Sequence, residues 1–279
     1  MIDTHVHFID PRRTDYPWLA NQILAPINRP FLPEDLAPVL EVNGVRAAIL
    51  VQTRSSLEES NEFLAHAQAH PWLAGVVAWA DLTAPDFALQ LEALRAAPGG
   101  YKLVGIRHQV QDEPDDSWLL RQDVQRGLAV LDDHDLTFDL LVKPQQLEAA
   151  IRTVRWFPSL TFVLNHIAKP PIASGQTAGW SEQISKLAEF PNVFCKVSGM
   201  VTEADWQHWQ SSDFVPYVEH IINSFGHERI LFGSDWPVCL LAADYGQVKA
   251  LFNELVGFDP QTAEQNARSA YRLTLEEAP

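Results

Sequence analysis

Eight apolar stretches of strand length recur along the chain, and they limit its possible folds more than any other feature. Their starts lie about 30 residues apart on average, which is the length that one strand and one helix need together. Most are almost continuously apolar rather than alternating, as expected of parallel strands covered on both faces. The stretches are 1–8, 46–52, 73–80, 103–108, 136–142, 160–166, 193–198 and 230–234.

The segments between these stretches carry apolar side chains at helical spacing. We expect helices over 57–70, 87–97, 145–156, 216–225 and 245–256. Repeated strand–helix units, eight in one chain, predict an α/β fold: a single (β/α)8 TIM-like barrel domain over residues 1–279. A doubly wound open sheet is the alternative, but the sequence has no Gly-rich phosphate turn to support it.

One segment interrupts the alternation of strands and helices. Residues 9–32 hold four prolines and three aromatic residues and follow the first strand. The loop therefore starts on the side of the barrel where the strands end, which is where binding residues gather. We expect residues 9–32 to form a wall of the pocket.

Charge and composition limit the partners and the compartment. The formal net charge is −16, so electrostatic repulsion argues against binding to nucleic acid or to an anionic membrane surface. Cys195 and Cys239 both lie in apolar stretches, which predicts buried thiols in a reducing compartment. The sequence shows neither a leader-like start nor an apolar run of about 18 residues, so a cytoplasmic location is expected. The oligomeric state stays open.

Three histidines and one aspartate lie at the ends of predicted strands. His5 and His7 are two positions apart, so their side chains share one face of a strand. His166 ends the sixth stretch and Asp235 follows the eighth. Because a barrel gathers such positions around one pocket, we predict that these four residues are catalytic. They are also the candidate metal ligands, since imidazole nitrogens and a carboxylate suit Zn²⁺ or Mn²⁺.

Other polar and aromatic side chains fall at the same strand ends and are candidates for substrate binding. Cationic groups there can hold a polyol or a carboxylate. Tryptophan rings can stack against the face of a sugar ring, a possibility that also applies to Trp18 in the 9–32 loop. The predicted substrate-binding residues are Arg107, His108, Lys169, Gln52, Trp79 and Trp236.

Four sequence motifs resemble the amidohydrolase superfamily. They are DTHVH at 3–7, NHIAKP at 165–170, FGSDWP at 232–237 and GIRHQVQDEPDDSWL at 105–119. Within the superfamily they are most similar to the sugar-lactonase and pyrone-dicarboxylate-lactonase branch, and the last is especially similar to the L-fuconolactonase group. The resemblance covers nearly the whole chain. It implies a TIM-like barrel, attack of water on a lactone carbonyl, and roles for His5, His7, His166 and Asp235.

The sequence departs from the superfamily pattern at strand four. Many members hold two metals bridged by a carboxylated lysine there, whereas this chain has Arg107 and His108, and Lys102 lies at the strand's start. A two-metal site is therefore not expected. One divalent ion, Zn²⁺ or Mn²⁺, and a metal-independent acid–base site both remain open.

The expected reaction is hydrolysis of a sugar-acid lactone of the L-fuconolactone or L-rhamnonolactone type. Asp235 would take a proton from water, and His166, Arg107 or a metal would stabilise the carbonyl oxygen. The acidic turn at 112–116 favours a neutral small-molecule substrate over a dianion. The alternatives are a 2-pyrone-4,6-dicarboxylate-type lactonase, a metal-dependent decarboxylase and a catalytically silent binding protein.

Overall fold

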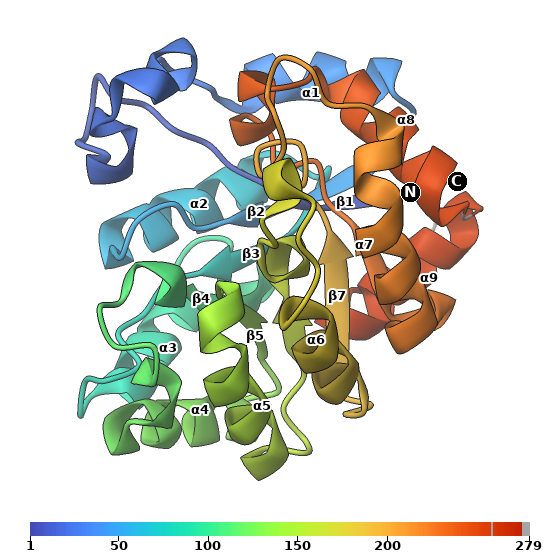
Figure 1. Cartoon of the computed structure of the whole chain (residues 1–279). Coiled ribbons are helices and arrows are strands. Elements are labelled where there is room, and N and C mark those ends of the chain that lie inside the picture. The colour runs from blue at the N-terminus through green and yellow to red at the C-terminus, as the bar shows by residue number, and fades with distance from the viewer. Residues whose placement is uncertain (258, 275–279) are drawn as a thin grey trace.

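The structure, a computed structural model, describes residues 1–257 and 259–274. Parallel strands pair in chain order to form a barrel surrounded by helices, which confirms the predicted fold (Figure 1). Each predicted apolar stretch contains one strand, although most strands are shorter than their stretch. The strands are β1 (Ile2–Val6), β2 (Ala47–Val51), β3 (Leu73–Ala78), β4 (Leu103–His108), β5 (Thr137–Leu140), β6 (Phe162–Leu164), β7 (Val193–Val197) and β8 (Ile230–Phe232).

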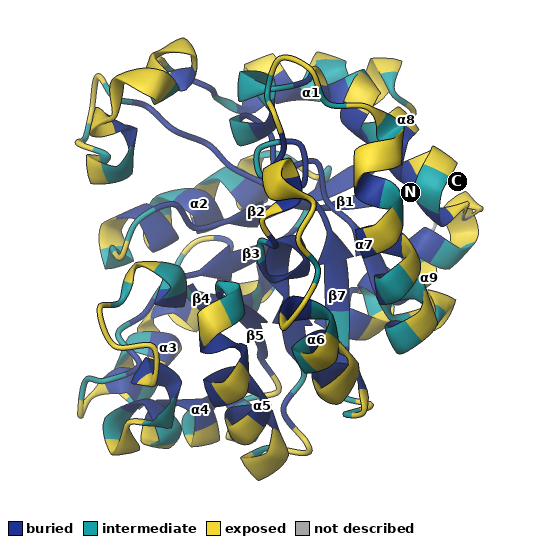
Figure 2. Ribbon diagram, in the orientation of Figure 1, coloured by how far each residue is buried: buried dark blue, intermediate teal, exposed yellow. Residues whose placement is uncertain are grey.

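The helices pack around the strands with one face buried and the other exposed (Figure 2). All five predicted helices are present, and α1, α4, α6 and α9 are additional. The buried residues of α4, Val124, Leu128 and Leu131, do recur at helical spacing, so the sequence pattern was sufficient to predict this helix as well. The helices are α1 (Pro33–Val42), α2 (Leu57–Ala69), α3 (Phe87–Ala96), α4 (Gln122–Asp133), α5 (Leu147–Trp156), α6 (Trp180–Ala188), α7 (Ser211–Phe225), α8 (Tyr245–Val256) and α9 (Pro260–Tyr271).

The first and last strands meet along a seam that side chains help to close. Thr4 Oγ1 donates to the carbonyl of Phe232 at 2.7 Å. One oxygen of the buried Asp3 carboxylate accepts the Ser234 amide at 3.0 Å, and the other accepts the Tyr245 hydroxyl of α8 at 2.9 Å. These bonds satisfy polar groups that have no water around them, and they fix the register between the two ends of the barrel.

A buried ion pair crosses the barrel interior. Lys196 of β7 and Asp139 of β5 are both fully buried, with Nζ 2.7 Å from Oδ2. The Tyr271 hydroxyl of α9 donates to Asp139 Oδ1 at 2.9 Å, and the Asn165 amide donates to Oδ2 at 2.9 Å. Each oxygen of the carboxylate therefore has partners, which is the condition under which a buried charge is tolerated.

Helix α9 covers the end of the barrel where the strands begin. Ala267, Ala270 and Tyr271 pack with Ile2 of β1 and Ala47 of β2 in one apolar cluster. The carbonyl of Ala270 also accepts the Thr137 hydroxyl, at the start of β5, at 2.7 Å. The opposite end, where the strands finish, is left for the loops that could carry a site.

The segment over residues 9–32 forms a long loop between β1 and α1, in blue in Figure 1, and its Leu19, Ile27 and Phe31 are buried in the main apolar core. Its ends are held together by paired backbone bonds, with Ile9 N to Phe31 O at 3.1 Å and Phe31 N to Ile9 O at 2.8 Å. Inside it are two short 3₁₀ helices, Pro17–Ala20 and Gln22–Ile27. The segment is thus an anchored loop with local structure.

Two further expectations concern the cysteines and membranes. Cys195 and Cys239 are both buried free thiols, as predicted. Within residues 1–257 and 259–274, no helix combines the length and the apolar character needed to cross a bilayer.

We expect Lys196→Met to lower the free energy of unfolding by about 3–5 kcal/mol, because it leaves the buried Asp139 carboxylate without its cation. Urea denaturation followed by circular dichroism measures the change. Lys186→Met on the exposed face of α6 is the matched control. The double variant with Asp139→Asn should lose less than the sum of the single losses, and strict additivity would contradict the pairing.

Candidate active site

Two imidazoles from β1 and its C-terminal extension lie side by side. His5 Nε2 and His7 Nε2 are 3.1 Å apart, so the i, i+2 spacing does place both rings on one face. His7 Nδ1 lies 2.7 Å from the carbonyl of Val51. A carbonyl can only accept, so Nδ1 of His7 donates its proton to Val51, and Nε2 faces the site.

His166 reaches the same place from a left-handed turn rather than from a strand. Strand β6 ends at Leu164, two residues before the predicted end, and His166 has φ 54°. The positive φ values continue through Lys169, which is unusual for residues other than glycine. The side chain is steadied by Ser198, whose Oγ lies 2.9 Å from Nδ1.

Gly199 makes room for this imidazole. A Cβ atom at position 199 would lie 2.4 Å from His166 Nδ1, and the residue itself has φ +59°. Any side chain would therefore displace the His166 ring as well as strain the backbone. The turn after β7 therefore packs closely against the turn after β6 where Gly199 meets the His166 ring.

Asp235 brings a carboxylate to the three imidazoles. It follows β8, has φ 60°, and its amide donates to the carbonyl of His5 at 2.9 Å across the seam. Its Oδ1 lies 3.3 Å from His7 Nε2, 3.8 Å from His5 Nε2 and 3.9 Å from His166 Nε2. The structure thus brings together all four residues that the sequence proposes as catalytic.

Burial sets the protonation states of this cluster. Burial lowers the pKa of His166 to about 3, and burial together with the charge of Lys196 holds the pKa of His5 well below its usual value. Burial also acts to raise the pKa of Asp235, but His166 and His7 outweigh it, so the net pKa is lowered. At neutral pH the cluster therefore contains an ionised carboxylate next to neutral His5 and His166.

The cluster opens into a cavity at the carboxyl ends of the strands. Three of the four cluster residues contribute to its wall, and the 9–32 loop contributes one residue, Trp18. The lining residues are His7, Trp18, Thr53, Arg107, Gln109, Gln111, Asp112, Leu141, His166, Lys169, Asp235 and Val238.

Both cations in this wall already have partners. The buried Arg107 guanidinium donates to Gln52 Oε1 at 2.9 Å and to Asn165 Oδ1 at 3.1 Å, and its Nη1 lies 3.1 Å from His5 Nε2. Lys169 Nζ is 3.0 Å from Glu203. The wall therefore offers no unpaired cation for a dianionic ligand among the residues that line it.

The structure places the other predicted binding residues away from the cavity wall. Gln52 is fully buried and holds Arg107. His108 stacks on Trp118 with ring centroids 4.2 Å apart, and it receives the indole N–H of Trp79 at 3.3 Å. Trp236 is buried, with its ring 5.3 Å from the ring of Phe31 at the base of the loop.

Several residues near the site were not proposed from the sequence. Thr53, Gln109 and Gln111 line the cavity one to three residues beyond strand ends, so extending each predicted strand end into its loop would have included them. Lys196 had a clearer signal, because a charged residue inside an apolar strand requires an opposite charge nearby. Asp139, in the middle of another apolar stretch, is that charge.

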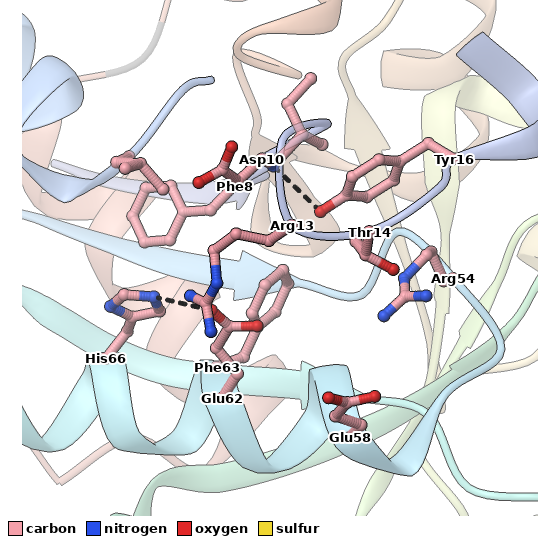
Figure 3. Close-up of a pocket in the computed structure, with 12 residues that line it drawn as sticks. Phe8, Asp10, Arg13, Thr14, Tyr16, Arg54, Glu58, Glu62, Phe63 and His66 are labelled. Carbon is pink, nitrogen blue, oxygen red and sulfur yellow. Dashed lines mark hydrogen bonds and ion pairs between the residues drawn. The ribbon is translucent and has the colours of Figure 1, made fainter. Parts of the chain in front are cut away.

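A second, smaller hollow lies between the start of the 9–32 loop and α2 (Figure 3). Its charged groups pair with one another: Arg13 lies 2.5 Å from Glu62, and His66 lies 3.9 Å from the same carboxylate. The Tyr16 hydroxyl accepts the Asp10 amide at 3.1 Å. The Arg13–Glu62 pair therefore seats the loop on α2.

The cluster has a donor set that fits one divalent metal ion. Ligand atoms of His5, His166 and Asp235 all lie within 4.8 Å of one another. Nε2 of His7, on the ring that the hydrogen bond from Nδ1 to Val51 orients, is the candidate fourth ligand atom. Imidazole nitrogens with a carboxylate oxygen match the preference of Zn²⁺.

Comparison with known proteins agrees with this geometry. The amidohydrolase family model matches residues 2–273. The chain belongs to the amidohydrolase family. It is 39% identical over 249 residues to an L-fucono-1,5-lactonase of Burkholderia ambifaria, covering 89% of this chain and 84% of the relative. It is 36% identical over 276 residues to an L-fucono-1,5-lactonase of Burkholderia multivorans, covering 95% and 92%.

The family likeness extends to the coordinates. A crystal structure of an amidohydrolase from Burkholderia multivorans with bound zinc matches this structure with a TM-score of 0.91 and 35% sequence identity. The match covers 98% of this chain and 99% of that one. This amidohydrolase is therefore an enzyme of a family in which a metal site is expected, and its own donor set is compatible with one.

The low pKa of His166 predicts a loss of stability in acid. The unfolded histidine has a pKa of 6.5 and the folded one about 3, so between these values the unfolded state binds more protons. This contribution is complete above pH 6.5 and is lost as the pH falls toward 3. We expect His166→Asn to reduce the dependence of unfolding free energy on pH over that range, as measured by urea denaturation. The exposed His208→Asn is the control, and an unchanged slope in His166→Asn would contradict the assignment.

Proposed function

We propose that this amidohydrolase opens the lactone ring of a neutral sugar acid, of the L-fuconolactone or L-rhamnonolactone type. The observation that carries the proposal is the Asp235 carboxylate. It is ionised, it lies in the wall of an open cavity, and its Oδ1 is 3.3 Å from Nε2 of His7. The two L-fucono-1,5-lactonases among its relatives support the choice of reaction.

Ring opening needs a base that later acts as an acid. Asp235 takes a proton from a water molecule as the water oxygen bonds to the lactone carbonyl carbon. The carbonyl oxygen gains negative charge, which the neighbouring His166 and the fixed positive charge of Arg107 stabilise. The bond to the ring oxygen then breaks, and Asp235 returns its proton to the leaving alkoxide. The product is the open-chain hydroxy acid.

A divalent ion held by His5, His7, His166 and Asp235 would add Lewis-acid polarisation of the carbonyl. The protein's own part is to orient these groups. A hydrogen bond to Val51 orients His7, and one with Ser198 orients His166. The backbone hydrogen bond to His5 positions Asp235. Held side chains of this kind lower the cost of reorganisation during the reaction.

The charges of the cavity favour a neutral lactone over a pyrone dicarboxylate. Arg107 and Lys169 are engaged by protein groups, and Asp112 adds a negative charge to the wall. A dicarboxylate would need two free cations there. Support of the cavity wall from behind is then the role of His108, Gln52, Trp79 and Trp236. Gln52 positions Arg107, and Trp236 packs under the loop.

The first prediction for this function concerns Asp235. Asp235→Asn should lower kcat on the preferred lactone by about 10²–10⁴-fold, because the amide cannot accept the proton of water. Initial rates of acid release at fixed pH measure it, after subtraction of spontaneous hydrolysis. Asp112→Asn, in the same wall, is the matched control and should lose far less.

The substrate panel for that assay contains sugar-acid lactones that differ at one stereocentre, 2-pyrone-4,6-dicarboxylate, and aromatic acids. We expect turnover of neutral sugar lactones. Preference for the dicarboxylate would show that the cavity charge is misjudged. Release of CO₂ from the aromatic acids without lactone turnover would place the protein with decarboxylases instead.

The second prediction concerns the metal. Dialysis against a strong chelator should abolish turnover, and added Zn²⁺ or Mn²⁺ should restore it, because the cluster supplies nitrogen and oxygen donors suited to these ions. Elemental analysis before and after dialysis verifies the metal content. Full activity in protein shown to be metal-free would mean that the same four residues work as an acid–base site alone.

A further inference from the structure

Lys169 belongs to the walls of two adjoining hollows. One is the catalytic cavity that contains Asp235, and the other, which we call the lysine hollow, lies where the connections after β5, β6 and β7 meet. Among the residues that the structure describes, Lys169 alone lines both. Burial acts to raise the pKa of Asp235, and the charge of Lys169 is among those that outweigh it. The lysine hollow is lined by Lys143, Pro144, Gln145, Lys169, Pro171 and Glu203.

The main chain at Lys169 is held firmly. Lys169 has φ 49° and ends the left-handed turn that carries His166. Its amide donates to the carbonyl of His166 at 2.7 Å. Pro170 and Pro171 follow directly, and the proline ring fixes φ at each of these positions. With the main chain held in this way, the position of the ammonium group depends on what binds the side chain.

Glu203, from the connection between β7 and α7, binds that side chain. Its Oε1 lies 3.0 Å from Lys169 Nζ. The Glu203 amide donates to the carbonyl of Met200 at 3.0 Å, and its carbonyl accepts the amide of Ala173 at 2.9 Å. Both side chains of the ion pair are 24% exposed. The pair therefore joins two anchored turns and is accessible from solvent.

Lys169 is the more accessible of the two cations in the wall of the catalytic cavity. The other one, Arg107, is 3% exposed and already donates to Gln52 and Asn165. The ammonium group has three N–H donors, and Oε1 of Glu203 takes one of them. A sugar hydroxyl can accept another without disturbing the ion pair. Lys169 can therefore bind a neutral ligand in the arrangement that the structure shows.

A ligand carboxylate meets a different balance at the same lysine. It needs the positive charge rather than a single donor, and Glu203 already offsets that charge. Asp112 and Asp235 add further negative charge to the cavity wall. Repulsion between like charges suppresses the wrong ligand and so creates specificity. Glu203 therefore disfavours anionic lactones, although it lines the lysine hollow and not the catalytic cavity.

We propose that Glu203 determines specificity for neutral lactones by binding Lys169 and offsetting its charge. This inference rests on the proposed function and deepens it, because it names the residue that keeps anionic substrates out of the same site. The simpler alternative is that the ion pair only ties two turns together. In that case its removal alters stability slightly and leaves selectivity as it is.

The test compares Glu203→Gln with the wild type on two lactones: the preferred neutral one, and its analogue with a carboxylate in place of the terminal methyl or hydroxymethyl group. The readout is kcat/KM on the anionic lactone divided by kcat/KM on the neutral one, at low ionic strength. This ratio should rise by about fivefold in Glu203→Gln, because the charge of Lys169 is no longer offset. Asp205→Asn is the matched control. It removes one charge from the same connection at a 60% exposed side chain, and should alter the ratio by less than about twofold.

Lys169→Met tests whether the effect passes through the lysine. In that background Glu203→Gln should leave the ratio nearly unaltered, and a gain of the same size as in the wild type would overturn the inference. An unaltered ratio in Glu203→Gln alone, or an equal rise in Asp205→Asn, would overturn it too. Since the expected result is a gain on one substrate, loss of folding cannot imitate it.

Calorimetric binding of glucarate, an open-chain sugar diacid, separates this inference from the proposed function. Protein that hydrolyses no lactone, yet binds glucarate about fivefold more tightly as Glu203→Gln than as wild type, would overturn the reaction and keep the role of Glu203. Equal binding of glucarate by the two proteins would overturn the role of Glu203.

Discussion

The seam between β1 and β8 is the constraint on which the catalytic cluster depends. The Asp3 carboxylate accepts the amides of both His5 and Ser234, at 3.0 Å each, and Ser234 lies 231 positions beyond Asp3 in the sequence. Burial raises the pKa of Asp3, and the hydrogen bonds from both amides act against that rise. Because Asp235 follows directly, its carboxylate can meet the histidines of β1 only if this join is in register. The seam therefore positions the Asp235 carboxylate relative to the histidines before a ligand binds.

Below the cluster, the barrel interior is more charged than its apolar strands suggest. Lys196 Nζ lies 3.2 Å from His5 Nδ1, and Arg107 lies on the other side of the same ring. A buried ion pair of this kind adds little net stability compared with an apolar pair, because desolvation offsets the pairing, even though removing one partner alone is costly. Their value is electrostatic: they hold His5 neutral and place fixed positive charge near the position where an oxyanion would form.

The fold could be predicted from the sequence because strands buried on both faces are recognisable as continuous apolar runs, and the carboxyl ends of such strands gather at one end of a barrel. The same rule located His5, His7, His166 and Asp235. It could not foresee the left-handed turn that carries His166, because non-glycine residues rarely adopt positive φ, and the space for the ring is left by Gly199, which lies on a different turn. Nor could it place Trp18 or Gln111 in the wall, because a loop's path depends on tertiary contacts that leave no periodic pattern.

Tyr271 joins the last described helix to the interior of the barrel, because its hydroxyl completes the shell of Asp139, which in turn holds Lys196 beneath His5. A ribosome delivers residues 260–271 only after all eight strands have been made. The nascent barrel therefore carries an unfinished charge network until α9 docks. Proteolytic removal of this helix would accordingly disturb the position of Lys196 beneath His5. Chains that lack α9 therefore lack part of the support of the catalytic cluster.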